Sequence, residues 1–169
     1  ARLWDAETGQ RVAVFEGAMG VILTAKFSPD DALIVTLSES SKARLWDGAT
    51  GKAVAVLSGH SKAITHVVFS NKGSLLATVS ADGTARLWET KTGQLLRTLE
   101  GHENTLVRSM FSADDTRLLT LTRATVRLWD TETAALLGEY QNRGGVLSPD
   151  GRHFVTGSRD DVSRVVELE

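Results

Sequence analysis

Short apolar runs alternate with turn-forming residues along the whole chain. In the best-preserved stretch the runs cover about 64–69, 75–79, 84–88 and 95–99, and the segments SNKG, SADG and TKTG separate them. Runs of this length rich in Val, Ile, Leu, Thr and Trp favour strands, whereas Ser, Asn, Asp and Gly favour the turns between them. No window of a dozen residues keeps a helical period. The pattern therefore predicts an all-β fold.

The same pattern recurs along the chain at an almost constant period. The tryptophans Trp4, Trp46, Trp88 and Trp129 are spaced by 42, 42 and 41 residues. Similar words surround them: RLWD or RLWE at each tryptophan, and FSPDDALIVTLS, FSNKGSLLATVS, FSADDTRLLTLT and LSPDGRHFVTGS along the chain. A period near 42 lies in the range of four-stranded propeller blades. The chain therefore consists of repeats of one sequence unit that differ by substitutions.

Several of these words resemble WD40 repeats of bacterial style. They are the pairs Gly59-His60 and Gly101-His102, the FSPD turn at 27–30 and the RLWD endings. The resemblance implies a β-propeller built of four-stranded antiparallel blades, with the first strand of each blade lining a central channel. On this basis residues 1–169 form one propeller segment, which divides into a partial blade with its third and fourth strands (1–15), three blades (16–57, 58–99 and 100–140) and an incomplete last blade (141–169).

One unit holds four residues at the positions of the hydrogen-bonded tetrad that the resemblance implies. They are His60, Thr78, Asp82 and Trp88. Histidine, aspartate and a hydroxyl are also the residue types of a nucleophilic triad. A catalytic set needs an exposed nucleophile and oxyanion donors in a cleft, whereas these groups tie strands and turns together. We therefore interpret the tetrad as structural and predict no catalytic residue.

The other units have lost parts of this set. In the first full unit Ala18 stands at the histidine position and Ser40 at the aspartate position, and in the third Arg123 stands near the aspartate position. The last unit keeps Thr156 and Asp160 but has no Gly-His pair. Only one blade is predicted to carry the full tetrad.

Composition and charge narrow the classes of partner. The net charge of −2 and the pI near 6.1 provide no basic field, so no nucleic-acid partner is expected. The chain has no bilayer-length apolar run and no signal-peptide layout, which predicts no membrane partner and a cytoplasmic location. Its four histidines lack the spacing of metal ligands, and it carries no phosphate loop or dinucleotide fingerprint. We expect no metal and no cofactor.

The resemblance implies a non-enzymatic scaffold that holds a protein or peptide partner. The implied contact face is formed by the loops before the inner strands and between the second and third strands. By position, the candidate contact residues are Leu23, Glu39, Lys62, Thr65, Ala81, Glu103, Asn104 and Val107. The alternative is a propeller enzyme, or a small-ligand binder with a site at the channel mouth. The apolar residues around the predicted inner ring disfavour it.

Three arrangements of the ring are compatible with the strand count. The chain closes alone if 11–15 completes the last blade, two copies pair into a larger ring, or the chain is an arc of a longer propeller in a multidomain protein. We favour the longer propeller, because a solitary arc exposes two apolar blade faces. Trp4 is expected in the core, and the arginines of RLWD are expected to solvate the outer rim.

Overall fold

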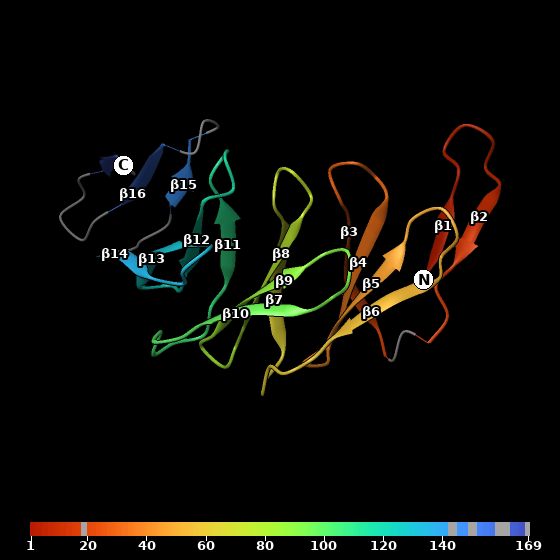
Figure 1. The fold of residues 1–169 in the computed structure, drawn as a ribbon, viewed down its shortest axis with the longest axis horizontal. Helices are drawn as coiled ribbons and strands as arrows, with labels where there is room; N and C mark the ends of the chain where they lie inside the picture. The colour runs from red at the N-terminus through yellow and green to blue at the C-terminus, as the bar shows by residue number, and fades with distance from the viewer. Residues whose placement is uncertain (18–19, 142–144, 149–151, 158–162, 168–169) are drawn as a thin grey trace.

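Five antiparallel β-sheets follow one another along the chain and stand side by side in an open arc (Figure 1). The computed structural model describes residues 1–17, 20–141, 145–148, 152–157 and 163–167. These residues form strands and turns and contain no helix. The predicted all-β fold class is confirmed.

Three of the sheets have four strands, hydrogen-bonded in chain order. Sheet 2 holds β3 (Ile22–Phe27), β4 (Leu33–Ser38), β5 (Ala43–Asp47) and β6 (Ala53–Leu57). Sheet 3 holds β7 (Ile64–Phe69), β8 (Leu75–Ser80), β9 (Ala85–Glu89) and β10 (Leu95–Leu99). Sheet 4 holds β11 (Arg108–Phe111), β12 (Arg117–Leu121), β13 (Thr125–Asp130) and β14 (Leu136–Gln141).

The two end sheets are smaller. Sheet 1 holds β1 (Arg2–Trp4) and β2 (Arg11–Val14), and sheet 5 holds β15 (Gly145–Leu147), β16 (His153–Gly157) and β17 (Ser163–Glu167). Strand β2 pairs with β1, and the described strands of sheet 5 pair only with one another. The closure in which 11–15 completes the last blade is therefore absent from the described part of this single chain.

Short polar turns set the register between the third and fourth strands. The Oδ1 atom of Asp47 accepts hydrogen bonds from the backbone N–H of Thr50 at 2.7 Å and from its hydroxyl at 2.6 Å. Asp5 and Asp130 make the same bonds to the threonine three residues later. A side chain that accepts a hydrogen bond from the backbone a few residues later stabilises a tight turn. The D-x-x-T motifs therefore form the turns of these hairpins.

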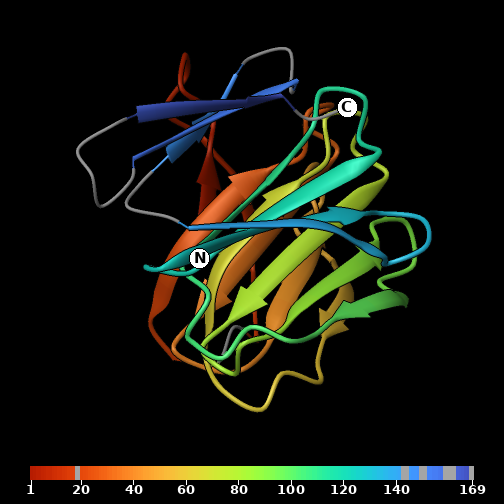
Figure 2. The same ribbon diagram turned by 90° about the vertical axis from the view of Figure 1, so that its left-hand side faces the viewer.

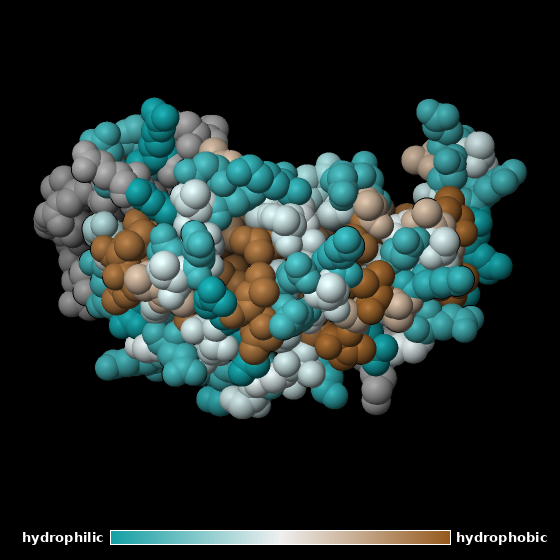
Figure 3. Space-filling view, in the orientation of Figure 1, coloured by the Kyte–Doolittle hydropathy of each residue, from teal (hydrophilic) through white to brown (hydrophobic). Residues whose placement is uncertain are grey.

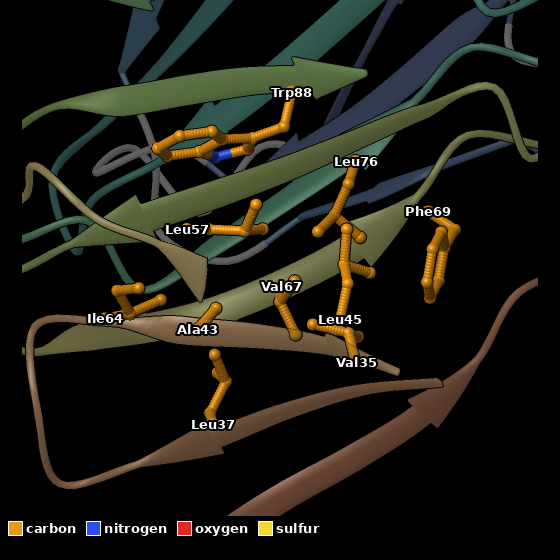
Figure 4. Close-up of a cluster of buried hydrophobic side chains, with 10 residues drawn as sticks. All are labelled: Val35, Leu37, Ala43, Leu45, Leu57, Ile64, Val67, Phe69, Leu76 and Trp88. Carbon is orange, nitrogen blue, oxygen red and sulfur yellow. The ribbon is translucent and has the colours of Figure 1, made fainter. Parts of the chain in front are cut away.

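The sheets stand one behind another (Figure 2), and neighbouring sheets bury apolar side chains against each other. Figure 4 shows the cluster between sheets 2 and 3, whose ten members are Val35, Leu37, Ala43, Leu45, Leu57, Ile64, Val67, Phe69, Leu76 and Trp88. Six of them are at most 1 % exposed, as expected of close-packed strands that alternate inward and outward residues. Burial of this surface holds the arc together.

A buried carboxylate also joins sheets 3 and 4. Asp115 lies in the turn before β12, is 7 % exposed, and has a positive φ of 68°. Its Oδ1 accepts from the backbone N–H of Asn71 at 2.7 Å, and its Oδ2 accepts from the backbone N–H of Lys72 at 2.8 Å. A buried charge needs such partners, and here they come from the neighbouring sheet. Asp115 therefore fixes one inter-sheet turn against the next.

The packing stops at sheet 1, and the prediction for Trp4 was wrong. Trp4 is 53 % exposed and Phe27 is 50 % exposed, whereas Trp46 and Phe69 are 1 % and 9 % exposed. The later tryptophans and phenylalanines pack on the preceding sheet. No described sheet lies before sheet 1, and sheet 1 has only two strands to offer sheet 2. This end of the arc therefore presents aromatic side chains to solvent.

The outer strands also expose apolar residues. Hydrophobic side chains gather over this part of the surface among mostly hydrophilic ones (Figure 3). The residues are Val12, Val14, Val54, Val56, Leu95, Leu96, Leu136 and Leu137, each at least 36 % exposed. In β2, β10 and β14 these residues share the strand with polar or charged residues. Strand β6 differs, because its sequence AVAVL is apolar throughout and it exposes Val54 and Val56.

Candidate functional site

The four tetrad residues of sheet 3 form one hydrogen-bonded chain. Trp88 Nε1 donates to Thr78 Oγ1 at 2.9 Å. Thr78 Oγ1 lies 2.9 Å from His60 Nε2, and His60 Nδ1 lies 3.0 Å from Asp82 Oδ2. Because the Asp82 carboxylate only accepts, His60 Nδ1 carries the proton and its Nε2 accepts from the Thr78 hydroxyl. Every member of the chain is then satisfied, and it ties β8 and β9 to the loop before β7.

Burial and hydrogen bonds set the charge states in this chain. Burial lowers the pKa of His60, and the Asp82 carboxylate opposes that effect only in part. Burial would raise the pKa of Asp82, but hydrogen bonds from Thr84, from the Ser61 backbone and from His60 hold this pKa far below its usual range. A neutral imidazole therefore donates to an ionised carboxylate.

This geometry does not suit a nucleophile. Thr78 is 0 % exposed, and the side chains of His60 and Asp82 are 1 % and 8 % exposed. The hydroxyl already donates to His60 and accepts from Trp88, so no substrate reaches it and no oxygen lone pair is directed into a cleft. The arrangement ties strands together and has no access for catalysis.

Sheet 4 keeps three members of the set. Trp129 Nε1 donates to Thr120 Oγ1 at 2.7 Å, and Thr120 Oγ1 lies 2.7 Å from His102 Nε2. His102 Nδ1 is buried and has no hydrogen-bond partner among the described residues. Burial, together with the charge of Arg127, lowers the pKa of His102 to about 4. The missing aspartate thus leaves one buried imidazole nitrogen unpaired.

Sheet 2 keeps only two members. Trp46 Nε1 donates to Thr36 Oγ1 at 2.8 Å. Ser40, at the aspartate position, bonds to the Ser38 hydroxyl at 2.9 Å. Residue 18, at the histidine position, lies outside the described residues, as does Asp160 of the last unit. The side chain of Thr156 is also outside the description.

Two of the RLWD arginines, Arg86 and Arg127, are not solvated rim residues as predicted, whereas Arg2 is exposed. An ideal Cβ on Gly59 would lie 1.9 Å from Nη1 of Arg86, and one on Gly101 would lie 2.5 Å from Nη1 of Arg127. Both glycines have a positive φ, of 134° and 113°. Arg86 Nε is buried without a partner among the described residues. The guanidinium groups therefore lie over the Gly-His loops. Each leaves no room for a Cβ at the glycine, which is a second reason for glycine there besides its positive φ.

The eight candidate contact residues come from loops at one edge of sheets 2 to 4, which we call the loop face. Each precedes or begins an inner strand, or follows a second strand. Seven of them are exposed and Ala81 is half-buried. The Thr65 hydroxyl is already used, because it donates to the Leu106 carbonyl at 2.6 Å. The largest apolar members are Leu23, 58 % exposed, and Val107, 40 % exposed.

A cavity of about 450 Å³ opens at the loop face. It is lined by Asn104, Thr105, Val107, Arg123 and Ala124, so it lies between the loop before β11 and the turn after β12. Two of these five residues, Asn104 and Val107, are among the predicted contact residues. Thr105, Arg123 and Ala124 were missed, although Arg123 and Ala124 occupy the turn that corresponds to Ala81 and Asp82 in sheet 3.

A row of polar side chains crosses the inner strands. Lys26 Nζ donates to the Val67 carbonyl at 2.7 Å and lies 3.2 Å from His66 Nε2. His66 Nδ1 lies 3.3 Å from Ser109 Oγ. The backbone N–H of Ser109 donates to the same Nδ1 at 3.3 Å. Burial, then the charges of Lys26 and Arg108, lower the pKa of His66 to about 4, so the imidazole is neutral near pH 7.

The described residues contain neither a metal-binding cluster nor a membrane-spanning helix. No group of three or more His, Cys, Asp or Glu side chains is placed to hold a metal ion. In the same part of the chain, no helix has the length and apolar character to cross a membrane. The polar groups with a clear geometric role are therefore the tetrads, the inner-strand row and the loop face.

Repeated four-stranded sheets, packed face to face around an arc and pinned by buried tetrads, define a segment of a β-propeller. A family model of the WD domain, G-beta repeat, matches residues 9–47, 51–89 and 93–130. The chain belongs to the WD40 repeat family, and the predicted resemblance is confirmed. Each matched segment begins before an outer strand and ends at a tryptophan-bearing strand of the next sheet, so every sequence repeat links two sheets.

Solved structures support the same fold. The computationally designed Ika8 protein superposes with a TM-score of 0.82 at 25% identity, over 99% of this chain and 52% of that chain. The computationally designed Ika4 protein superposes with a TM-score of 0.79 at 25% identity, over 95% of this chain and 99% of that chain. The chain thus spans about half the length of Ika8. No curated protein sequence matches it.

Proposed function

We propose that this chain is a non-enzymatic scaffold whose loop face binds a protein or peptide partner. WD40 repeats generally serve as protein-interaction scaffolds, and the family is typically non-enzymatic. The observation that supports the proposal most strongly is the composition of the loop face, where exposed Leu23 and Val107 stand among Glu39, Lys62 and Glu103. Apolar contact residues surrounded by a polar rim are typical of protein interfaces.

The cavity at the loop face supports a side-chain anchor. Its volume of about 450 Å³ accommodates one large side chain of a partner, and Val107 and Ala124 provide apolar contacts beside the charged Arg123. Buried anchors of this kind carry much of the free energy of binding in protein interfaces. We expect the partner to insert an apolar or acidic side chain here.

We further propose that the chain acts as an arc of a larger WD40 propeller in a multidomain protein. Exposed Trp4 and Phe27 occupy positions that neighbouring sheets cover elsewhere in the arc. A further blade would bury them in the same way. The superposition on half of the longer Ika8 chain fits such an arc, and the superposition on nearly all of Ika4 fits a ring of separate copies. Light scattering at increasing concentration separates this arrangement from a pair of identical chains, which requires a dimer.

The test of the binding proposal compares two variants. A peptide library is selected on the immobilised chain, and the dissociation constants of the selected peptides are then measured by fluorescence anisotropy. Leu23→Glu with Val107→Glu places charge on the loop face, and we expect at least roughly tenfold weaker binding. Val54→Glu is the matched control, because Val54 is 39 % exposed on an outer strand. Equal loss in both variants, or in neither, contradicts the proposal.

A further inference from the structure

Sheet 2 encloses a cavity where sheet 3 places its tetrad. The cavity measures about 320 Å³, near the lower end of the range for small-molecule sites. It is bordered by residues from four strands and from the turn between β4 and β5: Ile22, Thr36, Ser38, Ser40, Lys42, Arg44 and Val56. The cross-strand pairs Thr36–Arg44 and Thr78–Arg86 stand at the same register, so the two sites are directly comparable.

The substitutions between the two sheets account for the lost polar groups. Ser40 replaces Asp82, Lys42 replaces Thr84, and the repeat alignment places Ala18 opposite His60. In sheet 3 the side chains of Asp82 and Thr84 bond to each other and to His60. In sheet 2 the corresponding hydroxyl and ammonium groups border open space.

A hydrogen-bond donor is left over in this cavity. Thr36 is 3 % exposed, and its oxygen accepts from Trp46 Nε1. In sheet 3 the same threonine oxygen also contacts a histidine nitrogen, which accepts its proton. No acceptor for the Thr36 proton is present among the described residues. A buried hydroxyl without an acceptor is unfavourable, so the site favours a ligand that brings one.

The cavity also carries unpaired positive charge. Lys42 and Arg44 border it, no carboxylate is among its described lining residues, and neither cation makes a described salt bridge. In sheet 4 the corresponding Arg127 bonds to Glu139, which faces it across the strand pair. The residue that faces Arg44 is Val56. Sheet 2 therefore has the cation without the acid that pairs with it in sheet 4, and in sheet 3 Arg86 likewise faces an uncharged residue, Thr98.

We propose that this cavity binds a small carboxylate with a short apolar body. The carboxylate oxygens accept from the Thr36 hydroxyl and from Arg44, with Lys42 at the rim, because charge-assisted hydrogen bonds to a guanidinium are strong and geometrically specific. The carbon chain lies against Ile22 and Val56. This site is separate from the loop face proposed for the protein partner. The carboxylate belongs either to a free acid or to an acidic side chain of a peptide.

The test is a titration of the full chain followed by the indole N–H signals of its four tryptophans. Sodium propionate represents a free acid, N-acetylglutamyl amide represents an acidic side chain, and propionamide is the neutral control, all at constant ionic strength. We expect saturable shifts of the Trp46 signal with one or both carboxylates. The Trp88 signal is the internal control, because its tetrad is already complete. The carboxylate that binds identifies the source.

Variants at one register then test the role of the cation. Arg44→Gln should weaken the binding of propionate by roughly tenfold, whereas Arg86→Gln, at the same register in sheet 3, should leave it unchanged. Lys42→Gln is the second variant, since Lys42 is exposed and its loss does not threaten folding. We expect several-fold weaker binding. Unsaturable shifts, equal shifts with propionamide, or an affinity that neither Arg44→Gln nor Lys42→Gln lowers relative to the unsubstituted chain overturn the proposal.

Discussion

Sheets 2 and 3 are copies of one unit with different polar interiors. Both keep the bond from tryptophan to threonine, at 2.8 Å in sheet 2 and 2.9 Å in sheet 3. Only sheet 3 extends it through His60 to Asp82. The comparison shows that the apolar faces and the turns suffice to form the sheet, whereas the tetrad adds an internal tie between a loop, two strands and a turn. Function can therefore change at the tetrad position without loss of the fold.

The largest expected effect comes from removal of the shared threonine hydroxyl. Thr78→Val leaves both His60 Nε2 and Trp88 Nε1 without their partner, at a cost of about 2–4 kcal/mol in the free energy of unfolding. Thr36→Val is the matched control in sheet 2, where only Trp46 loses its partner, at about 1–2 kcal/mol. Urea unfolding monitored by circular dichroism measures both. Equal losses would show that the histidine bond contributes nothing.

Loss of the aspartate tests the outer end of the same chain. Asp82→Ala removes the acceptor of the buried His60 imidazole and of the Ser61 backbone N–H. We expect a cost of about 1–3 kcal/mol, seen as a lower melting temperature. Ser40→Ala, at the corresponding position in sheet 2, should change stability by less than about 0.5 kcal/mol. An unchanged melting temperature for Asp82→Ala would contradict a stabilising tetrad.

Acid should affect the histidine-bearing sheets more than sheet 2. The pKa of His102 is lowered to about 4 from its ordinary 6.5, so the unfolded chain binds more protons than the folded one between these values. Stability therefore falls as pH falls from about 6.5 to 4, by about 1–2 kcal/mol for this group. Urea unfolding at pH 7 and pH 4.5 measures the change. His102→Gln should make the pH dependence less steep without removing it, because burial also lowers the pKa values of His60 and His66. An equally steep dependence in that variant would show that His102 does not contribute.

The smallest expected effect is a gain. Ala18→His with Ser40→Asp copies the pair His60 and Asp82 into the unit of sheet 2. We expect the free energy of unfolding to rise by about 0.5–2 kcal/mol, because the Thr36 hydroxyl acquires an internal acceptor. Propionate should then no longer shift the Trp46 signal. A destabilised variant that still binds propionate would show that the two units differ in more than these residues.

Much of the fold followed from the repeat. The strands predicted at 64–69 and 95–99 match β7 and β10, the second strand ends one residue later than predicted, and the third is shifted by one residue. Alternating apolar residues and turn motifs predict these strand positions, because both signals are local in the sequence. The tetrad positions followed from the spacing of the repeat and the family resemblance.

Features that depend on contacts between residues far apart in the sequence could not be predicted from the repeat pattern. The RLWD arginines were expected to solvate the rim, but Arg86 packs over Gly59, twenty-seven residues earlier in the chain. Trp4 was expected in the core, but burial of a tryptophan requires the preceding sheet. Asp115 looks like an ordinary turn residue in FSADD, yet it accepts hydrogen bonds from another sheet. Each case is a long-range contact that a local pattern does not encode.

Hydrogen exchange at the backbone amides of β4 and β8 tests the central claim most directly, because it reads the local stability of both sheets in one sample. The account predicts that β8 exchanges about tenfold more slowly than β4, equivalent to about 1.4 kcal/mol, and that Asp82→Ala removes most of this difference. Equal protection of the two strands, or a difference that survives Asp82→Ala, would contradict the claim that the tetrad stabilises sheet 3.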